Sequence, residues 1–133
     1  MNIIFICRHN VFRSRVAEFY FKKYNKNKNI KAISGGLIKG IKNNKGQIEA
    51  FKDLNINPNK FTKPKNISVD ILRKQDLIII AADDVPIELF NNKSYVKKVI
   101  KWNIKDVTYD NKLHSIESIN LIEKKVKNLI KSI

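Results

Sequence analysis

A short apolar run that leads through a single cysteine into an amphipathic helix is the feature that most constrains this fold. Residues 2–6 are almost all apolar, Cys7 follows them, and Arg13 opens a segment with apolar residues at helical spacing. This order predicts a buried strand over 2–6 and a helix over 13–24, joined by a tight loop. A strand, a short loop and a helix in this order are typical of a parallel α/β sheet.

Strands and helices continue to alternate along the rest of the chain. Further strands are predicted over 30–34, 76–81 and 95–101, and further helices over 45–54, 68–73, 86–90 and 116–130. The run from Asp76 to Ala81 is apolar without alternation, as in a strand covered on both faces. No repeat or linker divides the sequence. We therefore expect residues 1–133 to form a single three-layer α/β domain, a four-stranded parallel sheet flanked by helices on both faces.

The loop that follows the first strand has the spacing Cys-x5-Arg-Ser, from Cys7 to Ser14. Backbone N–H groups at a helix N-terminus bind anions, and the planar fork of Arg13 suits phosphate. The nearby positive charge and the helix dipole favour the thiolate of Cys7, and Asn10 tolerates the left-handed backbone of a tight turn. Ser14 is expected either to cap the helix or to hydrogen-bond the sulfur. A lone cysteine is more often a small buried hydrophobe, but this pattern favours a nucleophile that forms a phosphocysteine.

The same residues carry a resemblance to a known family. Cys7 to Ser14 (Cys-Arg-His-Asn-Val-Phe-Arg-Ser), followed by Ala17-Glu18, resembles the loop of low-molecular-weight protein tyrosine phosphatases, whose fold thioredoxin-coupled arsenate reductases share. Ile33 to Gly36 and Trp102 to Asp106 are similar to two later segments of that family. The resemblance implies the strand order 2-1-3-4, with the active loop at the carboxyl end of the first strand.

The resemblance also implies a role for each matching residue. Cys7 would be the nucleophile, Arg13 the phosphate clamp, and Asp106 the general acid and base, with Asp110 in reserve. Ser34 would hydrogen-bond Asn10 and support the loop. The residues expected to bind phosphate are Arg8, His9, Asn10, Val11, Phe12, Arg13 and Ser14. Outside this set, we interpret Asp83 and Asp84 as helix-capping groups, Trp102 as a core or loop anchor, and His114 as a surface residue.

Four positions depart from the family's pattern. His9 stands where glycine is usual, which predicts a loop that closes fully only around an anion. Phe12 replaces a second cysteine that protects the nucleophile in many members. Val107 replaces the proline after the acid, and Tyr109 alone remains of a pair of tyrosines. These two positions therefore do not themselves support the family's placement of the acid or its recognition of an aromatic substrate.

The composition narrows the other possibilities. The net charge is +15, but the lysines are spread along the chain and no recognition helix, zinc finger or aromatic-rich basic strand is present. We interpret the charge as a solvated surface, with attraction of an anionic substrate or partner as the alternative, and expect no nucleic-acid partner. One cysteine and two distant histidines leave no metal set, so no metal or cofactor is expected. No signal peptide or membrane span is recognised, which predicts a cytoplasmic protein without membrane contact, and we expect a monomer.

Together these features predict a phosphatase that acts on phosphomonoesters, above all phosphotyrosine in proteins, or on small aryl phosphates. Two alternatives remain open. Arsenate resembles phosphate, but its reduction would need an external thiol because the chain has no further cysteine. The departures at His9 and Val107 also allow a phosphate-binding module without catalysis.

Overall fold

The computed structural model describes residues 1–40, 42–106 and 110–133. Its elements in chain order are β1 (Asn2–Cys7), α1 (Arg13–Tyr24), β2 (Lys31–Gly36), α2 (Lys45–Asp53), η1 (Pro58–Lys60), α3 (Val69–Arg73), β3 (Leu77–Ile80), η2 (Ile87–Phe90), β4 (Val99–Lys101) and α4 (Lys112–Ser132), where η is a 3₁₀ helix. The four strands form one sheet in the order β2-β1-β3-β4, and every neighbouring pair is parallel. The predicted α/β fold and strand order are confirmed.

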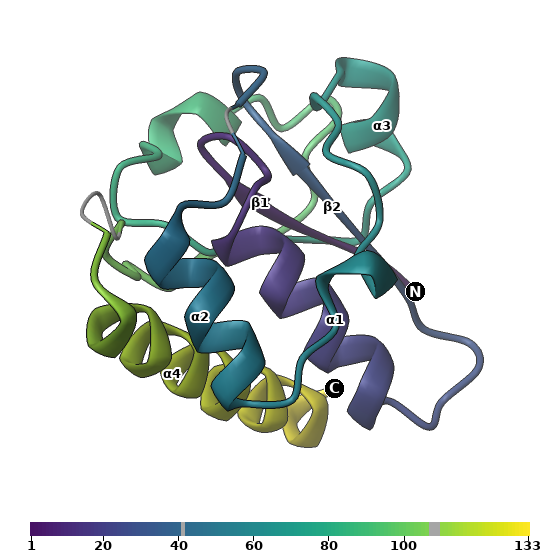
Figure 1. Cartoon of the computed structure of the whole chain (residues 1–133). Coiled ribbons are helices and arrows are strands. Elements are labelled where there is room, and N and C mark those ends of the chain that lie inside the picture. Colours follow the sequence, from purple (N-terminus) through teal and green to yellow (C-terminus); the bar gives the residue numbers. More distant parts are fainter. Residues whose placement is uncertain (41, 107–109) are drawn as a thin grey trace.

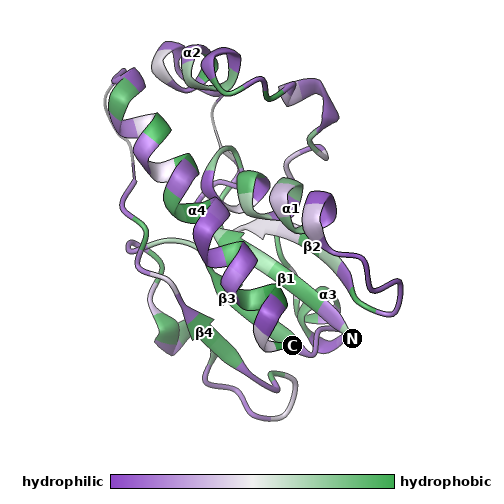
Figure 2. Cartoon of the chain, turned by 90° about the horizontal axis from the view of Figure 1, so that it is seen from below, coloured by the Kyte–Doolittle hydropathy of each residue, from purple (hydrophilic) through white to green (hydrophobic). Residues whose placement is uncertain are grey.

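Helices cover both faces of this sheet (Figure 1). On one face, Ile3 and Phe5 of β1 and Ile79 of β3 pack against α1, α2 and α4. On the other face, Ile4 and Ile6 of β1 belong to a second cluster with residues of α3 and η2. The alternation of side chains along β1 thus serves two cores, which explains why the strand is apolar throughout. Figure 2 shows the same hydrophobic character along β1, β3 and β4.

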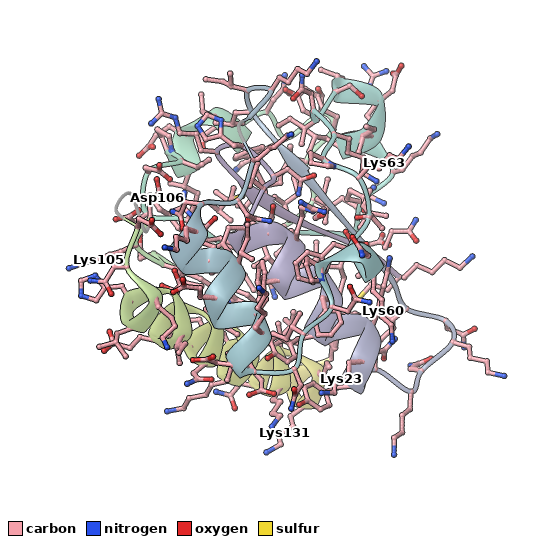
Figure 3. The ribbon with its side chains drawn as sticks, viewed as in Figure 1. Lys23, Lys60, Lys63, Lys105, Asp106 and Lys131 are labelled. Carbon is pink, nitrogen blue, oxygen red and sulfur yellow. The ribbon has the colours of Figure 1, made fainter. Side chains whose placement is uncertain are left out.

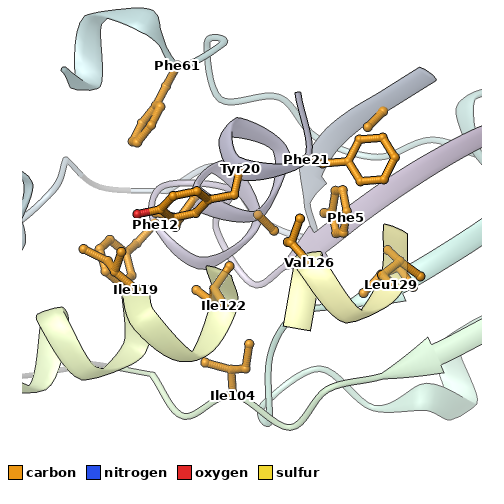
Figure 4. Packing of buried hydrophobic residues seen from close by; sticks show 14 of the residues in the cluster. Phe5, Phe12, Tyr20, Phe21, Phe61, Ile104, Ile119, Ile122, Val126 and Leu129 are labelled. Carbon is orange, nitrogen blue, oxygen red and sulfur yellow. The ribbon is translucent and has the colours of Figure 1, made fainter. Parts of the chain in front are cut away.

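The larger core joins the N-terminal and C-terminal parts of the chain. Aromatic rings dominate it: Phe5 lies 5.9 Å from Phe21 and 5.7 Å from Trp102 between ring centroids. Four side chains of α4 point into the same cluster, namely Ile119, Ile122, Val126 and Leu129 (Figure 4). Each fully buried side chain of this size contributes roughly 1.5–3 kcal/mol. This core fixes α1, and with α1 the end of the loop after Cys7.

Several boundaries differ from those predicted. The last helix starts at Lys112, four residues early, because the side chain of Asn111 accepts a hydrogen bond from the backbone N–H of His114 and caps it. The helix predicted over 86–90 is the 3₁₀ helix η2, with Pro86 at its N-cap. The strand predicted over 95–101 is shortened to β4, because residues 95 and 96 close a turn on the carbonyl of Asn92.

The carboxyl end of the sheet gathers the chemistry-bearing segments. β1 ends at Cys7, β3 is followed by Asp83 and Asp84, and β4 is followed by Asp106. Since β1 and β3 are neighbours, the residues that follow them meet at one edge. β2 also approaches this edge closely: a Cβ on Gly36 would lie 2.7 Å from the carbonyl carbon of His9, so only glycine fits there.

Candidate active site

Cys7 ends β1 beneath a loop of residues 8–12, here called the cysteine loop, that leads directly into α1. The residue is 3% exposed, and its Sγ lies 2.9 Å from Ser14 Oγ. Ser14 does not cap α1: Phe12 is the N-cap residue and makes no side-chain capping bond. Of the two roles expected for Ser14, the contact with sulfur is therefore the one present.

Asn10 organises the cysteine loop. Its φ of 56° is in the left-handed region, as predicted for a tight turn. Its Nδ2 donates to Ser14 Oγ at 2.7 Å and to Ser34 Oγ at 2.9 Å, and its Oδ1 accepts from the backbone N–H of Lys65 at 3.0 Å. The expected hydrogen bond between Asn10 and Ser34 is thus present. These bonds tie the loop to β2 and to the segment before α3.

The directions of these hydrogen bonds leave the hydroxyl proton of Ser14 free to point toward the sulfur of Cys7. A serine hydroxyl has a single proton to donate. Because Ser14 Oγ accepts from Asn10, its own proton is available to Cys7 Sγ. A hydroxyl donor at this distance stabilises a thiolate, both as a nucleophile and as a leaving group.

A buried carboxylate, Glu18, fixes the far end of this network. Its Oε1 accepts from Ser34 Oγ at 2.5 Å and from Thr62 Oγ1 at 2.9 Å, its Oε2 pairs with Lys22 Nζ, and its side chain is 4% exposed. Because Ser34 gives its proton to Glu18, its oxygen faces Asn10 as an acceptor. We call the series Glu18, Ser34, Asn10, Ser14 and Cys7 the Glu18–Cys7 chain.

Arg13 is buried, and its guanidinium donates three hydrogen bonds to other residues of the protein. Nη1 donates to Ile104 O at 2.9 Å and to Asp83 Oδ1 at 3.3 Å, and Nη2 donates to Asp84 Oδ1 at 2.9 Å. Guanidinium carries five N–H donors, so Nε and one hydrogen of Nη2 have no hydrogen-bond partner in the described part of the chain. Nε and Nη2 share one edge of the guanidinium, an edge that can donate two parallel hydrogen bonds to a phosphate.

The contact with Asp83 and Asp84 corrects their interpretation as helix-capping groups. Neither caps η2, whose N-cap residue is Pro86. Both instead form ion pairs with Arg13, and the backbone N–H of Asp83 donates to Ile104 O at 2.9 Å. A signal for this role was present in the sequence, because both residues directly follow a strand that parallel pairing places beside the first.

Asp106 is brought to the same guanidinium. Its Oδ1 lies 3.9 Å from Arg13 Nη2, and its side chain is 37% exposed, so it can meet both substrate and water. Asp110 is placed differently, since its Oδ1 accepts a hydrogen bond from the backbone N–H of Gly46 in the first turn of α2. The structure therefore unites Asp106, and not Asp110, with Arg13.

The remaining residues of the cysteine loop divide between surface and core. Arg8 is exposed, and its carbonyl accepts from the backbone N–H groups of Leu37 and Ile38. His9 is half-buried and is not among the non-glycine residues with positive φ, so its side chain does not strain the turn. Val11 and Phe12 are buried; the Phe12 ring lies 5.7 Å from that of Phe51.

Arg15 adds positive charge behind the loop. Its Nη1 donates to Val11 O at 3.3 Å and its Nε to Thr62 O at 3.0 Å. Burial lowers the pKa of Arg15, while attraction to Glu18 and Cys7 opposes that shift. Arg15 therefore places a positive charge near both Glu18 and Cys7.

Several residues named in the sequence analysis lie away from the site or outside the described residues. Val107 and Tyr109 lie outside the described residues. Trp102 packs against the larger core, and His114 is exposed on α4, both as predicted. Within residues 1–40, 42–106 and 110–133, no cluster of histidine, cysteine and carboxylate side chains is suited to a metal ion. No helix in the same ranges combines the length and apolar character needed to span a bilayer.

Comparison with known proteins decides the family. The family model of low molecular weight phosphotyrosine protein phosphatases matches residues 2–133. The chain belongs to this family. Membership of this family supports phosphatase activity for the chain. No curated protein matches the sequence closely enough to be reported as a relative.

Solved structures share the fold of this phosphatase family member. A low molecular weight phosphotyrosine phosphatase from Vibrio cholerae O395 has a TM-score of 0.84 at 17% identity, covering 99% of this chain and 95% of its own. An arsenate reductase from Archaeoglobus fulgidus has 0.74 at 24% identity, covering 97% and 98%. The YwlE arginine phosphatase from Geobacillus stearothermophilus has 0.76 at 14% identity, covering 98% and 91%. At these identities the likeness concerns the fold alone.

Proposed function

We propose that the chain hydrolyses phosphomonoesters, with phosphotyrosine in a protein or a small aryl phosphate as substrate, through a phosphocysteine intermediate. One observation carries this proposal: the carboxyl end of the sheet gathers the Cys7 thiol with a hydroxyl donor, the Arg13 guanidinium with two N–H groups to spare, and the carboxyl group of Asp106. Family membership supports the same reaction class. No metal or cofactor takes part in the proposed chemistry.

In the first step, Arg13 and the backbone N–H groups of residues 8–14 hold the phosphate over Cys7. The thiolate attacks phosphorus, the S–P bond forms, and the bond to the ester oxygen breaks. Asp106, in its protonated form, gives its proton to the departing oxygen. Ion pairs with Asp83 and Asp84 keep the Arg13 guanidinium in a fixed orientation, so that binding the phosphate requires little reorganisation.

In the second step, the intermediate is hydrolysed. The Asp106 carboxylate accepts a proton from water, the water oxygen attacks phosphorus, and the S–P bond breaks. The departing thiolate of Cys7 is stabilised by the proton of Ser14, which the Glu18–Cys7 chain orients. Inorganic phosphate is released and the thiolate is restored.

Two other substrates fit the same oxyanion site and serve as comparisons. Arsenate could replace phosphate, and its reduction would need glutathione or another external thiol, since Cys7 is the sole cysteine. Phosphoarginine is suggested by the arginine phosphatase of similar fold, and the acidic side chains around Arg13 could accept N–H groups of its leaving guanidine.

The deciding experiment measures turnover of p-nitrophenyl phosphate, phosphotyrosine peptide, phosphoarginine, and arsenate with glutathione, alongside retention on a phosphotyrosine resin. We expect hydrolysis of the two aryl phosphates by the wild type and none by Cys7→Ser. Arg13→Lys keeps the charge but lacks the fork, and should lose both affinity and rate. Retention on the resin without turnover would favour a binding module, and turnover of phosphoarginine or arsenate alone would reassign the substrate.

A further inference from the structure

A pocket of about 390 Å³ adjoins the cysteine loop. It is lined by His9 of that loop, by Lys39 and Gly40 after β2, and by residues 63–66 before α3. In the side-chain view, Lys63 lies on the opposite side of the molecule from Asp106 (Figure 3). Neither Arg13 nor Asp106 lines the pocket, which is therefore separate from the edge where these two residues meet.

The walls of this pocket carry positive charge without a counter-charge. Lys39, Lys63 and Lys65 are exposed, and within the described part of the chain no carboxylate oxygen lies within 4 Å of their ammonium groups. Three like charges around one concavity repel one another, and an anion between them would relieve that repulsion.

The pocket is built directly onto the cysteine loop. A Cβ on Gly40 would lie 2.4 Å from the Cβ of His9, so residue 40 must be glycine for the wall to close against the loop. The backbone N–H of Lys65, which also lines the pocket, donates to the Asn10 side chain. The contacts that shape the cysteine loop therefore also shape this pocket.

We propose that this pocket binds a second anionic group, a phosphate or a carboxylate, while the cysteine loop holds the phosphate that is removed. The preferred substrate would then be a phosphopeptide with acidic or phosphorylated residues near the reacting group. That conclusion about substrates rests on the proposed function, whereas anion binding in the pocket does not. The anion can belong to the substrate or be free inorganic phosphate, and the test separates the two sources.

The test compares Lys39→Gln/Lys63→Gln with a control, Lys26→Gln/Lys28→Gln. Both doubles remove two exposed positive charges, but the control residues lie in the loop between α1 and β2. The substrates are p-nitrophenyl phosphate and two phosphotyrosine peptides, one flanked by glutamates and one by glutamines. We expect the pocket double to lose about 3- to 10-fold in kcat/KM on the glutamate peptide only, with the control nearly unchanged.

Free phosphate is tested by NMR titration of the amides of residues 39, 40 and 63–66. Saturable shifts that the pocket double lacks and the control keeps, with no difference between the peptides, would support binding of the free anion. Equal losses in the two doubles on the glutamate peptide, together with no pocket-specific shifts, would overturn the proposal. If the wild type fails to hydrolyse p-nitrophenyl phosphate, the proposed function fails, and the titration alone then decides whether the pocket binds anions.

Discussion

Replacing Glu18 tests whether the buried Glu18–Cys7 chain organises the candidate site. Glu18→Met keeps the size of the side chain but removes the acceptor for Ser34, which is fully buried, and for Thr62, which is half-buried. Glu18→Gln is the matched control, because its Oε1 still accepts both hydroxyls. Its amide can face Lys22, whose side chain is 51% exposed and free to turn into water.

The contacts set the size of the expected effect. A buried hydrogen bond to a charged group contributes about 1.5–3 kcal/mol, and the half-buried one contributes about 1 kcal/mol. The exposed end of the Lys22 pair adds about 0.3–0.5 kcal/mol, and relief from burying a carboxylate offsets part of the total. We expect Glu18→Met to lower the free energy of unfolding by about 2–4 kcal/mol. At an unfolding entropy of roughly 2.1 cal/mol/K per residue over 133 residues, Tm should fall by about 7–14 °C.

Glu18→Gln replaces charged hydrogen bonds by neutral ones and should lower stability by about 1 kcal/mol, or about 3–5 °C in Tm. Thermal unfolding followed by circular dichroism at pH 7 measures both variants, and turnover of p-nitrophenyl phosphate reports on the site. Because Gln preserves the direction of the Ser34 proton, it should retain more activity than Met. Equal Tm and equal turnover in the two variants would refute the claim that an acceptor at this position orders the site.

Three further predictions use other contacts. Asp106→Asn should slow alkyl phosphates on the order of 10²–10⁴-fold but p-nitrophenyl phosphate much less, since its leaving group needs little protonation; equal losses would remove Asp106 as the acid. Prolonged peroxide should carry Cys7 to sulfinic and sulfonic acids that dithiothreitol does not reverse, because Phe12 offers no second sulfur; full recovery of activity would contradict this. Hydrogen bonds from the Asn2 backbone and Lys97 hold the pKa of Asp76 below its usual range. The ionised Asp76 should therefore stabilise the fold above about pH 4 and lose that effect as the pH falls through the lowered pKa. A difference in Tm between wild type and Asp76→Asn that stays constant down to about pH 2 would refute this prediction.

The fold could be predicted from the sequence because the apolar patterns that indicate its strands and helices are local. The apolar runs that became β1 and β3 read as buried strands, and α1 has the predicted bounds. The predicted start of α4 was wrong, because the residue that caps the helix is an asparagine among other polar residues and gives no periodic signal. The shortening of β4 depends on its turn at Asn92, a contact that periodicity does not reveal.

The candidate site was predictable only where its parts are neighbours in sequence. The spacing from Cys7 to Ser14 suggested the loop directly. The partners of Glu18 lie 16 and 44 residues away, and the Lys65 N–H lies 55 residues from Asn10, so these contacts required the fold. Glu18 did leave one signal, because it is a charged residue among the apolar residues of the buried face of α1.

Direct observation of the phosphocysteine tests the central claim. The wild type should be mixed with p-nitrophenyl phosphate, quenched in acid within the first turnovers, digested and examined by mass spectrometry. We expect the peptide that contains Cys7 to gain the mass of one phosphoryl group, and we expect this adduct to accumulate at least as strongly in Asp106→Asn, where hydrolysis of the intermediate lacks its base. Turnover without any phosphoryl group on Cys7, or turnover that survives in Cys7→Ser, would contradict the account.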